Sequence, residues 1–435
     1  MKKALSTFGV IVFLFVLLKS AAFADSLITV KTNLSTATVG EEITVSGTAP
    51  ASTFISIMGL DESGSILYFN AVQSDASGAY SDTFKLPESS DGKITFVAGS
   101  GSNTASADMK IYTAYYNSSS SSSSSSPVTV TFDKTALAVI KAATGGNYSV
   151  VAKKADVSGI ADSERAKIGS RPVYELSVKS GGTTISDFGG GKATVSIPYT
   201  LADGEDANKI VIYYVSSSGK LVAVPNCVYN ASAKTVNFTA KHFSTYAVGY
   251  NDVSFKDVSG WYTDYVSYLA ARGIISGTGD GNFSPDANIT RAQFVTVLAR
   301  VSGDDFSGYA SSEFSDVSTT DWFFKSVQWA YEKGVATGSD GKFNPNASIT
   351  RQDIAVMLAR YADKVAGYTL PETNSVAAFT DSAQISAYAS NAVTAMQQAG
   401  IISGNGNGSF APAANATRAQ AAKTIAVLLQ SMIGG

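Results

Sequence analysis

The last third of the chain alternates between helical apolar patterns and short glycine-rich loops, and the alternation occurs three times. After each loop, apolar residues recur at i, i+3, i+4 and i+7, beginning at Phe294, Ile354 and Ala421. This spacing puts them on one face of an α-helix. Further helices are predicted before the loops, over residues 265–272, 325–333 and 389–399. A glycine follows each of these, where a C-terminal cap belongs: Gly273, Gly334 and Gly400.

Each of the three segments opens with Phe-x-Asp and closes with a Thr-Arg pair at the predicted helix start. Thr290 and Thr417 each have a Gln three residues later, which predicts a capping box, and Thr350 has the shorter Asp353 there. A unit repeated at a near-fixed period cannot bury its own apolar face, so the copies must pack on each other. We predict an all-α bundle of three helix-loop-helix repeats, over residues 251–305, 312–366 and 376–435.

The pattern before the repeats has period two and predicts β-strands separated by Gly-containing turns. Strands are expected at 28–30, 42–46, 54–57, 66–69, 80–84, 94–97, 128–132, 174–178, 193–197, 210–215, 236–238 and 246–248. An unbroken serine run from Ser118 to Ser126 cannot bury apolar surface and marks a linker. The predicted fold is therefore multidomain, with two N-terminal all-β domains followed by the all-α bundle. Their predicted limits are 25–112 (a β-sandwich), 113–126 (the serine-rich linker) and 127–250 (a β-rich domain).

Residues 1–24 have the pattern of a secretory signal. Lys2 and Lys3 precede an apolar stretch too short for a lasting membrane anchor, and Ala22-Phe23-Ala24 fits a cleavage site. Cleavage would remove three lysines and lower the formal charge from −3 to −6. No cationic run remains, so we expect a secreted protein that is not inserted in a membrane and does not bind nucleic acid.

Few residues in this sequence are suited to bind a metal ion or to act as a catalytic nucleophile. Cys227 is the only cysteine, so there is no internal disulfide, and His242 is the only histidine. Asp162 and Glu164 are the nearest approach to paired carboxylates before the repeats, and a solvated helix face is the simpler interpretation. The sequence around Asp280 matches an EF-hand loop poorly, because no Glu closes it. No metal or other cofactor is expected.

The repeats carry a family resemblance. Phe-x-Asp-Val, a downstream Trp, Gly-Ile-Ile-x-Gly, Gly-x-Phe-x-Pro and Ile-Thr-Arg-Ala resemble the S-layer homology (SLH) domain over about residues 251–435. The resemblance implies a three-pronged module at a Gram-positive-type cell surface, whose grooves between repeats bind secondary cell wall polymer, often through a pyruvylated amino sugar. It leaves peptidoglycan and self-association in a surface layer open as further partners. Residues 25–112 resemble, more generally, the immunoglobulin-like modules of surface proteins.

Transferred to this chain, the resemblance implies wall-polymer contacts in all three repeats. Tyr388 stands near the position where the other two repeats have Trp. The candidate ligand-binding residues are Asp257, Trp261, Gly277, Arg291, Asp316, Trp322, Gly338, Arg351, Asp381, Tyr388, Gly404 and Arg418. Physical chemistry supports an acidic sugar ligand, because a helix N-terminus favours anions, an Arg side chain suits a carboxylate and an aromatic ring offers a sugar an apolar face.

Simpler roles remain open for each of these residues. The threonines are caps on the simplest interpretation, the arginines could pair with the Asp of their own repeat, and Trp261 and Trp322 could be core. Replacing Arg291 or Arg351 by Ala separates these roles, because a ligand contact predicts weaker wall binding with nearly unchanged thermal unfolding.

We expect an exported protein anchored to the cell wall or S-layer that displays two β domains and is not an enzyme. No nucleophile elbow, zinc motif or phosphate loop is found in the sequence. The alternative is a wall-anchored carbohydrate-active enzyme or sugar-binding module with its activity in residues 25–250. Glycosidases that use only carboxylates leave no local sequence signature.

Overall fold

The computed structural model describes residues 28–434, apart from 35, 38–41, 62–63, 87–91, 102, 112–127 and 147. The predicted signal and the serine-rich linker therefore lie outside the described residues. The chain divides into two compact units. One comprises residues 1–117, 129–150 and 188–193, and the other comprises 118–128, 151–187 and 194–435.

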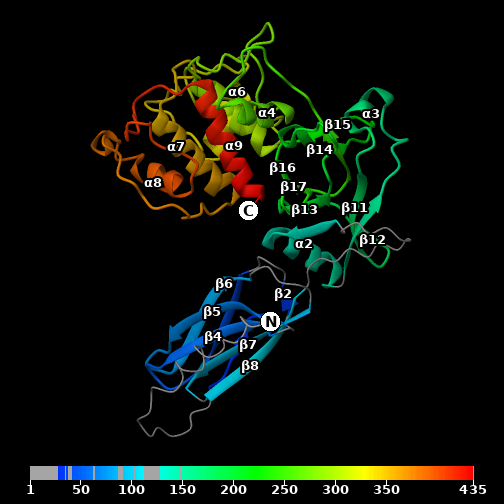
Figure 1. Ribbon diagram of the computed structural model, residues 1–435, viewed down its shortest axis with the longest axis vertical. Coiled ribbons are helices and arrows are strands. Elements are labelled where there is room, and N and C mark those ends of the chain that lie inside the picture. The colour runs from blue at the N-terminus through cyan, green and yellow to red at the C-terminus, as the bar shows by residue number, and fades with distance from the viewer. Residues whose placement is uncertain are drawn as a thin grey trace. The chain divides into compact units, whose positions relative to one another are not determined.

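The first unit contains a β-sandwich whose core side chains, such as Ile43, Ile55 and Phe96, are fully buried. The strands are β1 Lys31–Thr32, β2 Thr36–Ala37, β3 Glu42–Thr48, β4 Phe54–Leu60, β5 Ile66–Gln73, β6 Ala79–Lys85, β7 Gly92–Ser100 and β8 Asn103–Ile111. One sheet has the order β2-β8-β7-β4-β5, and its strands are labelled in Figure 1. The other sheet has the order β1-β3-β6. The sequence did not predict β8, whose outward positions are small or polar.

The first unit also holds β9, Thr129–Phe132, and an unpredicted helix, α2, Lys134–Thr144. Asp133 is the N-cap, and its side chain accepts a hydrogen bond from Ala136 N at 2.7 Å. Gly145 ends the helix at φ 62°. An Asp at the N-cap and a Gly at the C-cap are standard signals of the two ends of a helix, so this helix could have been predicted from the sequence.

Residues 151–187 and 194–250 form a β domain within the second unit. The elements are β10 Ser149–Lys154, α3 Asp162–Ile168, β11 Val173–Ser180, β12 Thr183–Ile185, β13 Ala193–Pro198, a 3₁₀ turn Ala207–Lys209, β14 Ile210–Val215, β15 Leu221–Val224, β16 Cys227–Asn230, β17 Thr235–Ala240 and β18 Thr245–Tyr250. The larger sheet has the order β10-β11-β18-β14-β15, and β12 pairs with β11. In another sheet β17 lies between β16 and β13.

The β architecture predicted before the repeats is confirmed, with α2 and α3 as additions to it. On α3, Asp162 and Glu164 do not face each other as a carboxylate pair. Asp162 pairs with Arg165 and Glu164 with Lys167, each at 2.8 Å. These ion pairs match the simpler interpretation of a solvated helix face.

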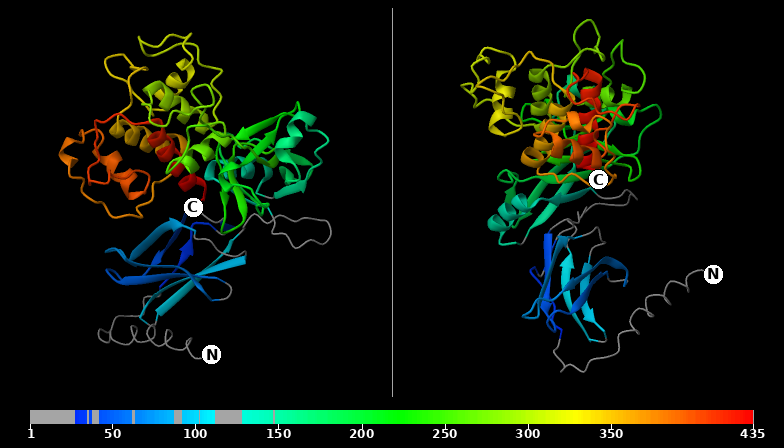
Figure 2. Two further views of the ribbon diagram at one scale, coloured as in Figure 1. Left: turned by 45° about the horizontal axis from the view of Figure 1, so that its top comes forward. Right: turned by 90° about the vertical axis from the view of Figure 1, so that its left-hand side faces the viewer.

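The C-terminal part has two main helices in each repeat, close to the predicted positions (Figure 2). They are α4 Thr263–Ala271 and α5 Arg291–Ser302, α6 Phe324–Glu332 and α7 Arg351–Arg360, and α8 Ser390–Gln398 and α9 Arg418–Gly434. A π-helical segment, Tyr361–Ala366, extends α7, and a 3₁₀ turn covers Ser382–Gln384. The capping box is complete at Thr290 and Gln293.

The prediction of an all-α bundle is wrong, because the repeats meet around extended backbone as well as around helices. The segments that precede α5, α7 and α9 form a closed ring of hydrogen bonds. Ile349 N donates to Ile289 O at 3.0 Å, Ala416 N to Ile349 O at 2.9 Å and Ile289 N to Ala416 O at 3.1 Å. Isolated β-bridges such as Thr290 to Ser348 flank this ring. Backbone pairing between repeats thus fixes the position of the N-terminus of α5, α7 and α9.

Within the second unit, Arg272 connects the β domain to the first repeat, and this residue is only 3% exposed. Its guanidinium donates to four main-chain carbonyls: Cys227 O at 2.8 Å, Asn208 O at 2.9 Å, Tyr268 O at 2.8 Å and Ile210 O at 2.9 Å. Three of these acceptors belong to the β domain. The β domain and the repeats therefore share a buried polar interface.

Candidate ligand grooves

The aspartates of the Phe-x-Asp segments hold the glycine-rich loop of their own repeat. Asp381 accepts hydrogen bonds from Phe410 N at 2.8 Å and Ala411 N at 2.7 Å. Asp257 and Asp316 make the same pair of contacts in their repeats. The second donor always has a left-handed backbone, as at Ala411 with φ 55°. This geometry supports a role in holding the loop, because a non-glycine residue is unfavourable there without such support.

The acid sensitivity of the repeats should depend on these carboxylates. The backbone donors Phe283 N and Phe410 N hold the pKa values of Asp257 and Asp381 below their usual range. A lowered folded-state pKa stabilises the fold above the unfolded-state pKa, and that stability disappears as pH falls through the folded value. We expect Asp381→Asn to be less stable at pH 7 and to lose less further stability below pH ~4 than the natural chain. Urea unfolding at several pH values measures this, and parallel curves for the two proteins would contradict it.

The loop glycines Gly277, Gly338 and Gly404 lie where a side chain would not fit. At Gly404, an added Cβ would stand 2.9 Å from both Ser409 O and the Phe379 ring. At the other two glycines the corresponding carbonyl would stand 2.5 Å from the added Cβ, and the ring 2.9 Å at Gly277 and 2.5 Å at Gly338. Their proximity to the opening Phe of the repeat therefore accounts for glycine at these positions, whether or not a ligand contacts them.

Each arginine of the Thr-Arg pairs reaches the loop of the next repeat, and the three contacts close a circle. Arg291 Nε donates to Phe343 O at 3.0 Å, Arg351 Nε to Phe410 O at 2.7 Å and Arg418 Nε to Phe283 O at 2.8 Å. Each guanidinium also lies over the ring of that Phe, at 4.5–5.0 Å. Burial lowers the pKa of all three guanidinium groups, but an arginine remains cationic at physiological pH. The arginines are thus not ion-paired to the Asp of their own repeat.

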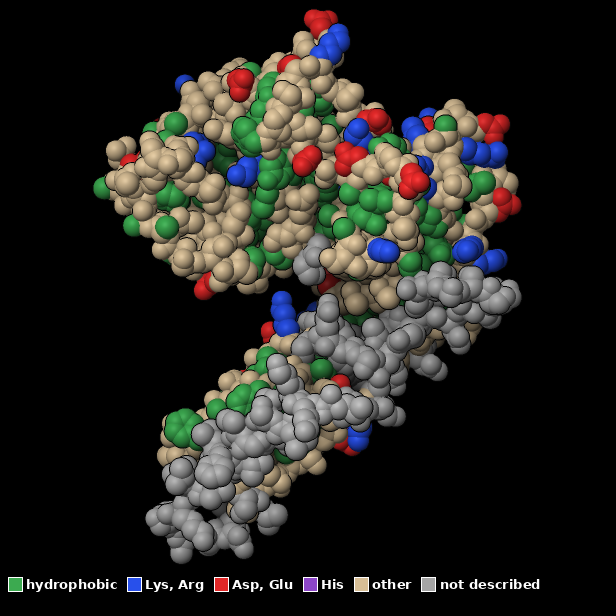
Figure 3. Space-filling model, viewed as in Figure 1, with side chains coloured by type: hydrophobic (Ala, Val, Ile, Leu, Met, Phe, Trp, Pro, Cys, Tyr) green, Lys and Arg blue, Asp and Glu red, His purple; other side chains and the backbone are tan. Residues whose placement is uncertain are grey.

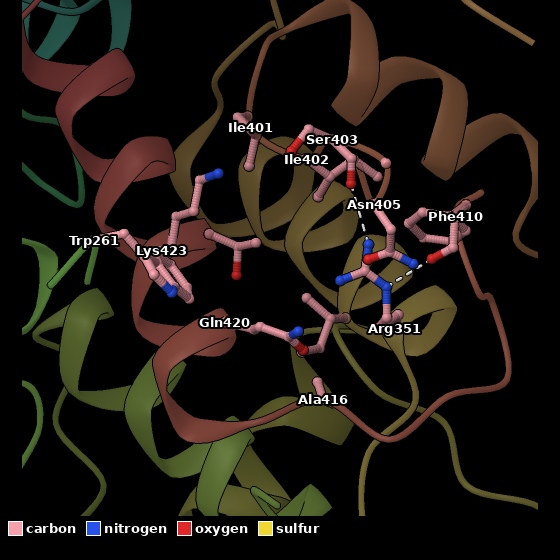
Figure 4. A pocket seen from close by; sticks show the side chains of 13 residues that line it. Trp261, Arg351, Ile401, Ile402, Ser403, Asn405, Phe410, Ala416, Gln420 and Lys423 are labelled. Carbon is pink, nitrogen blue, oxygen red and sulfur yellow. Dashed lines mark hydrogen bonds between the residues drawn. The ribbon is translucent and has the colours of Figure 1, made fainter. Parts of the chain in front are cut away.

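The first groove, which we call the Trp261 groove, combines residues of all three repeats (Figure 4). Trp261 and Lys423 line one side and Arg351 lies opposite, beside the loop that contains Gly404 and Asn405. The cavity has a volume of about 200 Å³. Arg351 Nη2 donates to Ser403 O at 3.1 Å, and Nη1 has no partner among the described residues. The groove thus offers a cationic donor opposite an indole ring.

The second groove, the Trp322 groove, repeats this arrangement one step around the circle. It is lined by Trp322, Arg418, the Gly277 loop and the α5 residue Thr296, with a volume of about 390 Å³. Arg418 Nη2 donates to Ser276 O at 2.8 Å, which again leaves Nη1 without a partner in the described part of the chain. The buried Thr296 hydroxyl also has no hydrogen-bond partner there. This groove therefore presents two polar groups that a ligand could satisfy.

Both indole side chains are largely exposed, Trp261 at 58% and Trp322 at 65%. They are therefore not core residues, in contrast to the fully buried Trp329. An exposed, flat aromatic ring near a partly buried arginine suits a sugar that carries an anionic group.

The third equivalent position around the circle, which we call the Tyr388 groove, brings together Tyr388, Arg291 and the Gly338 loop. Its contacts differ from those of the other two grooves. Tyr388, 59% exposed, takes the place of Trp. Its hydroxyl donates to Asp353 Oδ1 at 2.8 Å, and Arg291 Nη1 lies 3.6 Å from Asp353 Oδ2. Burial, together with the bond to Asp353, raises the pKa of Tyr388 to about 12. Gly338 keeps its loop position here, but the free arginine nitrogen of the other grooves faces a carboxylate of the chain itself.

Three groove residues were missed by the sequence analysis: Lys423, Thr296 and Asn405. Lys423 Nζ lies 5.9 Å from the centre of the Trp261 ring. Its repeat equivalent is Thr296, so the two share one position on the groove-forming helices. A polar residue on the apolar side of a helix is the signal that could have identified both.

Over the face shown in Figure 3, Lys and Arg are interspersed with Asp and Glu on the C-terminal part.

Comparison with known proteins identifies the repeats. Residues 254–295, 313–355 and 378–422 match the family of the S-layer homology domain. The chain is 33% identical over 237 residues to an amylopullulanase of Thermoanaerobacterium thermosulfurigenes, which covers 54% of this chain and 13% of that protein. It is 36% identical over 183 residues to an endoglucanase of a Bacillus species, covering 41% and 19%. It is 38% identical over 122 residues to the surface-layer 125 kDa protein of Lysinibacillus sphaericus, covering 26% and 10%.

The chain thus matches between a tenth and a fifth of the length of these relatives. The relatives include enzymes as well as a surface-layer protein, which contradicts the expectation that a chain of this kind is not an enzyme. The SLH domains and the surface-layer relatives indicate a location at the cell surface or wall. Among the described residues, no helix is both long and apolar enough to cross a membrane.

Proposed function

Because this chain is a cell-surface protein with three S-layer homology domains, we propose that these domains anchor it non-covalently to the cell wall. The proposed ligand is secondary cell wall polymer, bound in the Trp261 and Trp322 grooves. An acidic unit of the polymer, such as a pyruvylated amino sugar, would meet the free Nη1 of Arg351 or Arg418. The neighbouring indole would pack against the sugar ring.

One observation carries this proposal. The same three elements, an exposed indole, a partly buried arginine with one free terminal nitrogen and a glycine-rich loop, occur twice around the circle of repeats. Each arginine is already positioned by hydrogen bonds to loop carbonyls. It therefore loses little conformational freedom when an anion binds. Because the chain is acidic overall, binding of an acidic polymer must rely on such local cationic sites.

Replacement of the groove arginines tests the proposal. We expect Arg351→Ala and Arg418→Ala each to weaken binding of the intact chain to wall sacculi by about tenfold or more, because each removes a charged hydrogen-bond donor. The structure changes the earlier expectation for stability. Each variant should also lose about 1–3 kcal/mol of unfolding free energy, since the arginine holds carbonyls of the next loop.

Arg291→Ala is the matched variant for this experiment. Arg291 holds Phe343 O in the same way, so a similar loss of stability is expected, but its Nη1 lies beside Asp353. Sacculus binding, measured by co-sedimentation at a temperature where all variants are folded, should fall much less for Arg291→Ala. Equal loss of binding in the three variants would mean that binding depends only on the stability of the repeats.

A second candidate function is carbohydrate processing or sugar binding by residues 25–250. It is motivated by the relatives of this chain, which include an amylopullulanase, an exoglucanase, an endoglucanase and a xylanase. The test is release of reducing sugar from pullulan, β-1,4-glucan and xylan by the intact chain. Activity on one of these would support this function, and inactivity on all three, together with no binding to them, would count against it.

A further inference from the structure

The Tyr388 groove differs from the other two because of the side chain at the third position of its helix. In α5 and α9 this position is glutamine, and the glutamine bends back to the helix N-cap. Gln293 Oε1 accepts from Thr290 N at 3.0 Å and Gln420 Oε1 from Thr417 N at 3.2 Å. The side-chain oxygen is thereby used by the N-cap amide, and a neutral amide, not a carboxylate, lines the groove beside the arginine.

Asp353 occupies this position in α7 and is one methylene shorter. Its backbone N–H donates to the Thr350 hydroxyl at 3.3 Å, but the returning half of the capping box is absent in α7. A carboxylate that does not reach the N-cap amide is free to face the groove. There it accepts from the Tyr388 hydroxyl at 2.8 Å and lies 3.6 Å from Arg291 Nη1.

The arginine contacts change accordingly. In the two open grooves, Nη2 of the arginine donates to the serine carbonyl just before the loop glycine, Ser403 O or Ser276 O. The equivalent carbonyl in the second repeat is that of Thr337, and no hydrogen bond joins it to Arg291, both residues being within the described part of the chain. Arg291 and Asp353 are both well covered, with side-chain exposures of 17% and 24%.

We propose that Asp353 is an internal occupant of the Tyr388 groove, and that its carboxylate takes the place of an external anion between Arg291 and Tyr388. The chain then has two open grooves and one that is closed by its own side chain. This inference deepens the proposed anchoring function and rests on it for the identity of the ligand. It further implies that one substitution, Asp353→Gln, restores the capping box and frees Arg291.

The first arm of the test needs no ligand. Phenylglyoxal, which modifies accessible arginine side chains, is applied to the intact chain, and modification is followed by peptide mass mapping. Asp353→Gln should increase the modification rate at Arg291 several-fold and leave the rates at Arg351 and Arg418 unchanged. An unchanged rate at Arg291 would overturn the proposal, whether or not the chain binds wall polymer.

The second arm counts binding sites. Fragments of one or two repeating units, released by acid from purified Gram-positive sacculi, are titrated calorimetrically into the full chain. We expect two sites per natural chain, three for Asp353→Gln and one for the reciprocal variant Gln293→Asp, which places a carboxylate beside Arg418. Three sites in the natural chain, or two in Asp353→Gln, would contradict the internal occupant. Absence of any binding by the natural chain would instead contradict the proposed anchoring, and the first arm would still decide on Asp353.

Discussion

Arg272→Ala is expected to lower the free energy of unfolding of the second unit by about 3–5 kcal/mol. The guanidinium is buried, lies 3.7 Å from the centre of the Tyr268 ring and donates to four carbonyls from both sides of the interface. Its removal takes one donor from each of these carbonyls, and of the four Cys227 O keeps the Tyr268 hydroxyl at 2.9 Å. The buried position leaves little room for water to replace the lost donors. Urea unfolding of the intact chain, followed by far-ultraviolet circular dichroism, measures the loss.

The variant Arg272→Lys separates charge from geometry in this experiment. A lysine keeps the positive charge but cannot donate to four carbonyls in fixed directions, so most of the loss should remain. Arg360→Ala is the matched control, because Arg360 is only partly buried and lies at the far end of α7. A loss below about 1 kcal/mol for Arg272→Ala would show that the four hydrogen bonds of Arg272 contribute little to the stability of this interface.

The double replacement Trp261→Ala and Trp322→Ala should abolish most of the wall binding, with a loss of affinity above about 100-fold. Each indole is expected to supply roughly 2 kcal/mol of binding free energy, as buried aromatic contacts often do. Both rings are more than half exposed, so the free energy of unfolding should change by less than about 0.5 kcal/mol. Co-sedimentation with sacculi measures the binding, and urea unfolding measures the stability.

Two other exposed rings provide the control for this pair. Phe54 and Phe69, on β4 and β5, are 68% and 62% exposed and belong to the other compact unit. Their joint replacement by Ala removes a similar exposed aromatic surface and should leave wall binding unchanged. Equal losses in the two double variants would indicate non-specific adhesion through surface aromatics.

The sequence predicted the local structure of the repeats well, because that structure follows from short-range rules. The caps Thr290 and Thr417 and the glycines that end α4, α6 and α8 stand at positions where their chemistry is required. The central ring of Ile289, Ile349 and Ala416 was not predicted. Each of these segments is too short to show a strand pattern, and its partners lie about 60 or more residues away.

For the grooves too, the sequence predicted some features and not others. The sequence identified the arginines and the exposed aromatics, but it could not reveal that each arginine reaches the loop of the next repeat. Asp353 was recognised as a shortened version of the capping box. That its carboxylate then contacts Arg291 depends on the closure of the circle, which brings the first and third repeats to α7. Site residues that depend on contacts between repeats therefore needed the structure.

Wall anchoring by the repeats is tested by co-sedimentation of the intact chain with purified Gram-positive sacculi, before and after acid extraction of the secondary polymer. We predict binding to untreated sacculi, loss of that binding on extraction, and inhibition of binding to untreated sacculi when the extracted polymer is added in solution. Binding that survives extraction would point to peptidoglycan as the ligand. No binding to untreated sacculi would contradict wall anchoring by these repeats.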